Sequence, residues 1–68
     1  MIEILGRKFL TTKEASKRYG MSEDWFSQRR WKNLPPKYTK ICDNGRVLYP
    51  KIETDQWFEH QLRMREGA

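Results

Sequence analysis

Three polar side chains recur at helical spacing in the middle of the chain. Asp24, Ser27 and Gln28 share this spacing with Trp31, at offsets of three, four and seven residues, so a helix would place them on one face. A glutamine amide can form two hydrogen bonds with adenine, a carboxylate can accept from the amino group of cytosine, and a serine hydroxyl can bond to a base or a phosphate. Asp24 also has a structural explanation, because the helix dipole favours a carboxylate in the first turn.

Basic side chains follow and surround this segment. We expect Arg29, Arg30 and Lys32 to bind phosphate groups, which fixes position without reading sequence. The alternative for the two arginines is that their alkyl stems cover aromatic rings. The remaining candidates are Thr12, Lys13 and Lys17 for the nucleic-acid backbone, and Lys40, Asn44, Gly45 and Arg46 around a turn.

Arg46 is the candidate for a narrow minor groove, where A·T-rich sequence concentrates negative potential. The alternative is a solvated arginine beside a turn. For Trp31 we expect packing against the rest of the domain, with contact to a sugar or to single-stranded bases as the alternatives.

Other kinds of chemistry have few residues to draw on. His60 and Cys42 are the only histidine and cysteine, which leaves little for nucleophilic catalysis or a thiolate metal site. Glu53, Asp55 and Glu59 share a predicted helix without histidine or cysteine at ligand spacing, so we interpret them as a solvated face. We therefore expect no enzyme activity, metal or cofactor.

The charge is distributed unevenly along the chain. The net charge is +5, and the segment from Arg7 to Lys40 carries ten basic and three acidic residues, a balance of +7. From Ile41 to Ala68 there are four basic and five acidic residues, a balance of −1. This asymmetry favours nucleic acid as the partner, with one binding face and one supporting element. The alternative is that the basic residues only solvate helix surfaces.

The length allows one small domain, over residues 1–68, with an ordered core from about residue 9 to residue 64. Nine aromatic residues among 68 argue against disorder. No apolar run approaches a membrane span or a signal-peptide core, so we expect a cytoplasmic protein without a membrane partner.

Capping residues predict two short helices joined by a tight turn. Thr11 and Glu14 form a capping box, with a first helix from about Thr12 to Tyr19 that ends at Gly20. Ser22 is a good N-cap for a second helix from Glu23 to about Lys32. The tight turn predicts a helix-turn-helix.

A hairpin and a third helix complete the predicted order of elements. Asn44 and Gly45 favour a hairpin between strands at residues 38–42 and 46–49, and Pro50 can begin a helix over about residues 51–64. Residues 1–9 are predicted to be a short strand or an extended arm. We expect ion pairs between Glu14 and Arg18 and between Glu59 and Arg63. The third helix has a predicted inner stripe of Ile52, Trp57, Phe58 and Leu62, and the predicted core is Tyr19, Phe26, Tyr49, Ile52, Trp57 and Phe58.

Several short motifs resemble small winged-helix proteins of the MerR-like superfamily. Leu10-Thr11-Thr12-Lys13-Glu14-Ala15 is similar to their opening, and Gly20-Met21-Ser22 before a short helix resembles the approach to their second helix. In particular, the chain resembles phage excisionases and AlpA-type regulators over about residues 9–62. The segments that carry this resemblance are Leu34-Pro35-Pro36-Lys37, Gly45-Arg46-Val47-Leu48-Tyr49 and Trp57.

This resemblance implies a mainly α fold with a small β-hairpin, a winged helix-turn-helix in which the second helix enters the major groove and the hairpin wing meets the minor groove. It implies an excisionase that binds and bends attachment-site DNA and favours excision by a tyrosine recombinase (integrase) in a bacterial host cell, near the nucleoid. The alternative is a small AlpA-like transcriptional regulator. Because one small domain covers few base pairs, we expect a dimer or a side-by-side array on double-stranded DNA. A second alternative is a protein-interaction module that uses an exposed Trp25 or Trp31.

Overall fold

The structure, a computed structural model, describes residues 1–40 and 45–66. In chain order the elements are β1 (Ile2–Ile4), β2 (Arg7–Thr11), α1 (Thr12–Tyr19), α2 (Glu23–Trp31), β3 (Thr39–Lys40), β4 (Val47–Pro50) and α3 (Lys51–Glu66). The strands form one antiparallel sheet with the order β1-β2-β4-β3. The sequence predicts a mainly α fold with one hairpin. The structure has three helices beside a four-stranded sheet, so its β content is larger than predicted.

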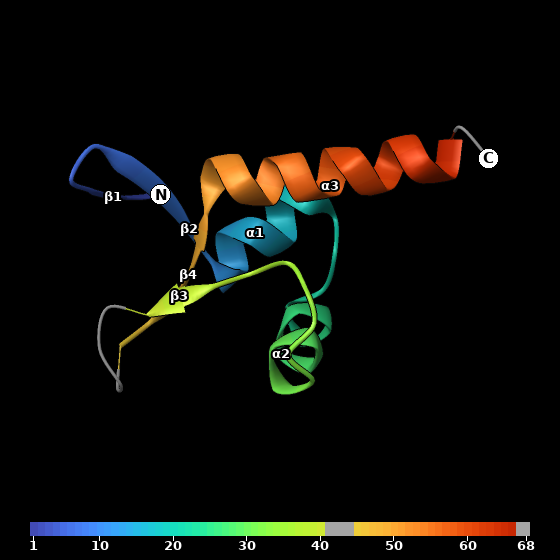
Figure 1. Cartoon of the computed structure of the whole chain (residues 1–68). Coiled ribbons are helices and arrows are strands. Elements are labelled where there is room, and N and C mark those ends of the chain that lie inside the picture. The colour runs from blue at the N-terminus through green and yellow to red at the C-terminus, as the bar shows by residue number, and fades with distance from the viewer. Residues whose placement is uncertain (41–44, 67–68) are drawn as a thin grey trace.

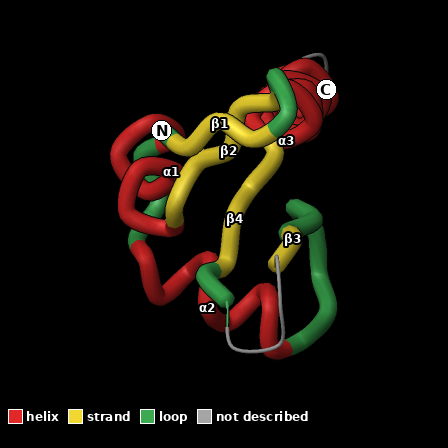
Figure 2. The backbone as a smooth tube through the Cα atoms, turned by 90° about the vertical axis from the view of Figure 1, so that its left-hand side faces the viewer, coloured by secondary structure: helices red, strands yellow, loops and turns green. Residues whose placement is uncertain are grey.

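The helices lie at different levels along this sheet. Figure 1 shows α3 along the top, α2 at the bottom and α1 between them, and the second view shows the same order. Helix α3 packs on β2 and β4, whereas α1 contacts β2, β4 and α2. In both views the pair β3–β4 reaches from the sheet toward the level of α2 (Figure 2).

The caps of α1 lie where the sequence predicts them. The Thr11 hydroxyl accepts a hydrogen bond from the backbone N–H of Glu14 at 3.2 Å, and the Thr11 N–H donates to the Glu14 carboxylate at 3.0 Å. Gly20 has φ of 71° and ends the helix in the left-handed conformation. The predicted bounds of α1 are therefore confirmed.

Helix α2 begins as predicted and ends one residue earlier. The Ser22 hydroxyl accepts a hydrogen bond from the Trp25 N–H at 3.1 Å, and the last helical residue is Trp31. Phe26 is 0% exposed, so it fixes the rotation of α2 about its axis. Pro36, just after the helix, is buried beside the start of α3.

The predicted hairpin is confirmed by the pairing of β3 with β4. Thr39 lies opposite Leu48 and Lys40 opposite Val47. The predicted turn residues Asp43 and Asn44 lie outside the described residues, as does Cys42.

A second hairpin, β1–β2, replaces the predicted single strand or arm at the N-terminus. Ile4 lies opposite Arg7, and the two-residue turn between them has φ of 51° at Leu5 and 78° at Gly6. Positive φ at both positions is the geometry of a type I′ turn, which Asn-Gly usually fills. Because leucine is a poor residue for that conformation, the sequence gives only a weak indication of this turn.

The core is centred on the sheet and the faces of α1 and α2. Its buried apolar residues are Phe9, Leu10, Ala15, Phe26, Leu48 and Tyr49. Of the predicted core, Phe26 and Tyr49 are confirmed, whereas Tyr19, Trp57 and Phe58 are half-buried around it. The rings of Tyr19 and Phe58 stack with centroids 4.2 Å apart.

The prediction that Ile52 belongs to the core is wrong, because its side chain is 66% exposed. The inward residue of the first turns of α3 is Thr54, which is 2% exposed. Two residues separate the two side chains by about 200° around a helix, so Ile52 lies on the outer side. Leu62 of the predicted stripe is also exposed, because the last turns of α3 extend past the sheet (Figure 1).

Candidate nucleic-acid interface

The outer face of α2 presents the predicted polar set to solvent. Asp24, Ser27, Gln28 and Lys32 are all exposed. Their orientation follows from Phe26, whose burial turns the opposite side of this short helix outward. Helix α2 can therefore offer a carboxylate, a hydroxyl, an amide and an ammonium group to one ligand.

Trp31 also belongs to this exposed face, so the prediction that it packs is wrong. Its side chain is 86% exposed, whereas Trp25 is half-buried against Phe26 with ring centroids 4.9 Å apart. Trp25 directly precedes Phe26, but Trp31 follows it by five residues, which turns its side chain about 140° away around the helix. The position beside the core therefore belongs to Trp25.

Arg29 lies on the inner side of α2 and contacts two aromatic rings. Its guanidinium carbon is 4.8 Å from the ring centroid of Trp25 and 5.6 Å from that of Trp57. Its Nε–H donates a hydrogen bond to the carbonyl of Pro35. The structure therefore favours the alternative in which Arg29 covers aromatic rings and holds the chain after α2.

Arg30 connects α2 to the sheet and to the start of α1. Its guanidinium donates hydrogen bonds to the Tyr49 hydroxyl at 2.8 Å, to the Ser27 hydroxyl at 3.1 Å and to the Thr12 hydroxyl at 3.4 Å. Burial raises the pKa of Tyr49, and the bond from Arg30 opposes that shift. Arg30 is therefore held in one orientation, with a side chain that is only half-buried.

A shallow hollow separates α2 from the β3–β4 pair, and we call it the aromatic hollow. Its lining residues are Ser27, Arg30, Trp31, Tyr38, Lys40 and Val47. It brings Lys40, predicted from the hairpin, beside residues predicted from α2. Nearby in sequence, Arg46 is exposed and Gly45 is half-buried, whereas Asn44 lies outside the described residues.

Of the α1 residues predicted to contact the nucleic-acid backbone, only Thr12 is hydrogen-bonded to α2. Lys13 and Lys17 are exposed and lie one turn apart on α1. Thr12 is half-buried and meets α2 through Arg30.

An ion-pair cluster around Asp55 ties α1 to α3 and supports the arrangement. The carboxylate accepts two hydrogen bonds from Arg18 at 2.9 Å each, one from the Tyr19 hydroxyl at 2.5 Å and one from Lys51 at 3.3 Å. The bonds from Arg18 are the main cause that holds the pKa of Asp55 well below its usual range. Asp55 is thus a structural centre, and not part of a solvated face as predicted.

This cluster also corrects the predicted pair between Glu14 and Arg18. Arg18 pairs with Asp55 instead, and Glu14 pairs with the N-terminal ammonium. That ammonium and the Thr11 backbone lower the pKa of Glu14 to about 2. The predicted pair between Glu59 and Arg63 is confirmed.

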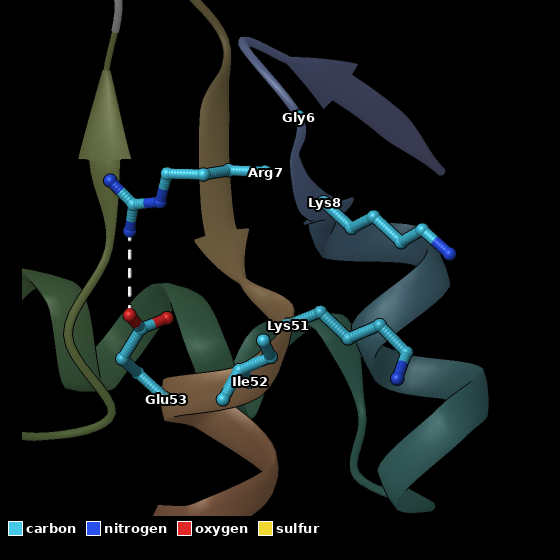
Figure 3. A pocket seen from close by; sticks show the side chains of 6 residues that line it. All are labelled: Gly6, Arg7, Lys8, Lys51, Ile52 and Glu53. Carbon is cyan, nitrogen blue, oxygen red and sulfur yellow. Dashed lines mark hydrogen bonds and ion pairs between the residues drawn. The ribbon is translucent and has the colours of Figure 1, made fainter.

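A second hollow lies at the opposite end of the molecule, where α3 begins (Figure 3). Arg7 and Glu53 form an ion pair across it at 3.4 Å, and the Lys51 ammonium is 3.3 Å from Asp55. Two of its three cations are therefore already compensated, which makes it a weaker candidate for an anionic ligand than the α2 face.

Neither a family model, nor a curated protein, nor a solved structure gives a significant match to this chain. Within residues 1–40 and 45–66 there is no group of three or more histidine, cysteine or acidic side chains that could hold a metal ion. Over the same part of the chain, no helix has the length and apolar character needed to cross a membrane.

Proposed function

We propose that this chain is a winged helix-turn-helix domain that binds double-stranded DNA with sequence preference. The observation that carries the proposal is the outer face of α2, where Asp24, Ser27 and Gln28 are exposed together while Phe26 anchors the opposite side. An exposed helix that carries amide, hydroxyl and carboxylate groups is suited to the major groove, which admits an α-helix and displays a distinct pattern for each base pair.

Two further features support the proposal. The β3–β4 pair lies at the same end of the molecule as α2 and carries Lys40, with Arg46 just before β4, so it suits the role of a wing at a minor groove (Figure 2). The segment from Arg7 to Lys40 carries the positive balance of +7 that phosphate contacts require. The β1–β2 hairpin then serves as an additional support next to α1.

Within this function we propose the role of an excisionase, which bends attachment-site DNA and acts with a tyrosine recombinase. The support is the resemblance of residues 34–37 and 45–49 to such proteins. A small transcriptional regulator is the alternative. An in vitro excision reaction with the integrase encoded nearest to the gene would distinguish the two, since a regulator leaves the yield of excision unchanged.

The test of DNA binding is a titration of the purified domain into DNA from upstream of its own gene and into a scrambled duplex. We expect tighter binding to the upstream duplex, in successive steps, and a loss of orders of magnitude between about 50 and 200 mM salt. Equal, weak binding to both duplexes would contradict a sequence-reading role for α2.

One observation favours a second candidate, a protein-interaction module. Trp31 is 86% exposed, and exposed tryptophans are frequent hot spots of protein interfaces. Affinity for such a partner would depend on the indole and would change little with salt, whereas affinity for DNA falls steeply. The titration into DNA at two salt concentrations separates the two candidates, because only the DNA-binding candidate predicts a steeply salt-dependent affinity for a duplex.

A further inference from the structure

The aromatic hollow has two exposed rings among its lining residues. Trp31 stands on the last turn of α2 and is 86% exposed, and Tyr38, which just precedes β3, is 41% exposed. Large aromatic side chains are usually buried for most of their surface, so an exposed tryptophan next to a second exposed ring indicates a binding surface.

Two cations contribute to the same hollow. Arg30 is fixed in place by its bonds to Tyr49, Ser27 and Thr12, and Lys40 is exposed on β3. A half-buried guanidinium and an exposed ammonium beside two apolar rings form a mixed surface. Such a surface suits a ligand that is anionic at one side and carries C–H groups at the other.

The position of the hollow narrows the ligand further. It lies between α2 and the β3–β4 pair, the two elements that the proposed function places in adjacent grooves. Adjacent major and minor grooves of a duplex are separated by one sugar-phosphate strand, so a protein that enters both must straddle that strand. The residues expected to read bases, Asp24, Ser27 and Gln28, lie nearer to the start of α2 than Trp31 does.

We propose that the aromatic hollow binds one deoxyribose-phosphate unit of this strand, with the Trp31 ring against the sugar and Lys40 on the phosphate. Tyr38 bounds the sugar from the hairpin side, and Arg30 adds positive potential from its fixed position. This inference rests on the proposed function and adds to it a sequence-independent apolar contact, which aligns α2 and the hairpin on the duplex.

The first test compares how two substitutions change the salt dependence of duplex binding. Trp31→Ala should weaken binding about tenfold at every salt concentration, because an apolar contact releases no counterions. Lys40→Ala should weaken binding and also lower the slope of log affinity against log salt by about one. Lys8→Ala, at the opposite end of the molecule, removes the same charge and should leave both quantities unchanged.

The second test locates the contact on the DNA. In a duplex with single phosphates replaced one at a time by uncharged methylphosphonate, one position should weaken the wild type but not Lys40→Ala. An abasic nucleotide at that position should bind Trp31 as well as the intact one does, because the ring contacts the sugar. If the abasic nucleotide weakens the wild type and not Trp31→Ala, the ring stacks on a base and the proposal is overturned.

The outcomes separate this inference from the proposed function. If the wild-type protein shows no salt-dependent affinity for any duplex, the proposed function itself fails. If the wild type binds a duplex and Trp31→Ala binds equally well, only the sugar-phosphate site is overturned. Because Trp31 is 86% exposed, its truncation should leave the melting temperature unchanged, which a thermal melt of each variant checks.

Discussion

Gln28 illustrates how a single exposed amide can carry sequence preference. Of its two neighbours in the chain, Ser27 lies on the same outer face, whereas Arg29 lies against Trp25 and Trp57. A bidentate contact of this kind contributes about 1–3 kcal/mol of discrimination between bases.

We therefore expect Gln28→Ala to reduce the preference for the upstream duplex over the scrambled one by roughly tenfold or more, with little change in affinity for the scrambled duplex. Competition binding with the two duplexes measures both quantities. Lys32→Ala is the matched control, since a phosphate contact should weaken both duplexes alike. A uniform loss for Gln28→Ala would show that another element reads the bases.

Asp55 gives a second prediction at this scale, on stability and pH. Its folded-state pKa is depressed below the ordinary value of 3.8, so its contribution to stability is present above that value and is lost as the pH falls toward the folded pKa. Asp55→Asn should lower the melting temperature at pH 7 by roughly 5 °C.

Thermal melts between about pH 7 and pH 2 check the sign of this effect. The gap between wild type and Asp55→Asn should narrow as the pH falls below 3.8, because the carboxyl of the unfolded chain takes up a proton there while that of the folded chain does not. Glu53→Gln is the control, since its pair with Arg7 is exposed on both sides and should contribute little. A constant gap across this pH range would contradict the role of the carboxylate charge.

At the scale of elements, local rules predict α1 and α2 well and the turn of β1–β2 poorly. The caps at Thr11, Gly20 and Ser22 act within a few residues, so the chain sequence contains the full cause of where these helices begin and where α1 ends. The β1–β2 turn has leucine where asparagine is usual, so the local sequence is only a weak indication of the hairpin.

Other features could not be predicted because their causes are distant in sequence. Asp55 meets Arg18 across 37 residues, and no spacing rule connects them. The exposure of Ile52 and Trp31 depends on which side of each helix faces the rest of the domain. Apolar character alone does not decide which of Trp25 and Trp31, both on α2, is buried. The exposed polar residues of α2 were predictable, because one strong inward anchor at Phe26 fixes the helix face.

The β1–β2 turn leads to a prediction about stability. Leu5 has φ of 51° and is 99% exposed, so it pays a conformational cost of about 1–2 kcal/mol without packing against anything. Leu5→Asn should raise the melting temperature by several degrees, because asparagine tolerates the left-handed conformation. Leu5→Val should lower it, since a β-branched side chain tolerates that conformation least. Circular dichroism melts of the three proteins decide the matter, and an order of Val above Asn would contradict it.

For the whole molecule, the uneven charge predicts where neutralisation matters. Lys13 and Lys17 lie in the segment with a balance of +7, whereas α3 lies in the segment with a balance of −1. Joint replacement of the two lysines by glutamine should lower affinity for any duplex and reduce the salt slope by up to about two. Replacement of Lys51 is unsuitable as a control, because it bonds to Asp55, so Arg65→Gln on the exposed end of α3 takes that place. If the α1 and α3 substitutions lowered the affinity and the salt slope equally, the positive charge would attract DNA without a defined binding face.

The small core described above has a consequence for how the protein persists in a cell. The few buried apolar side chains among the described residues leave the protein with a small free energy of unfolding, and the aromatic hollow is assembled from segments that come together only in the folded chain. A duplex that occupies this face therefore draws the population toward the folded state, by about 2.7 kcal/mol at a free concentration one hundred times its dissociation constant. Because proteases cleave unfolded chains, they would degrade protein that is not bound to DNA first. The lifetime of each molecule would then depend on whether it is bound to its DNA site.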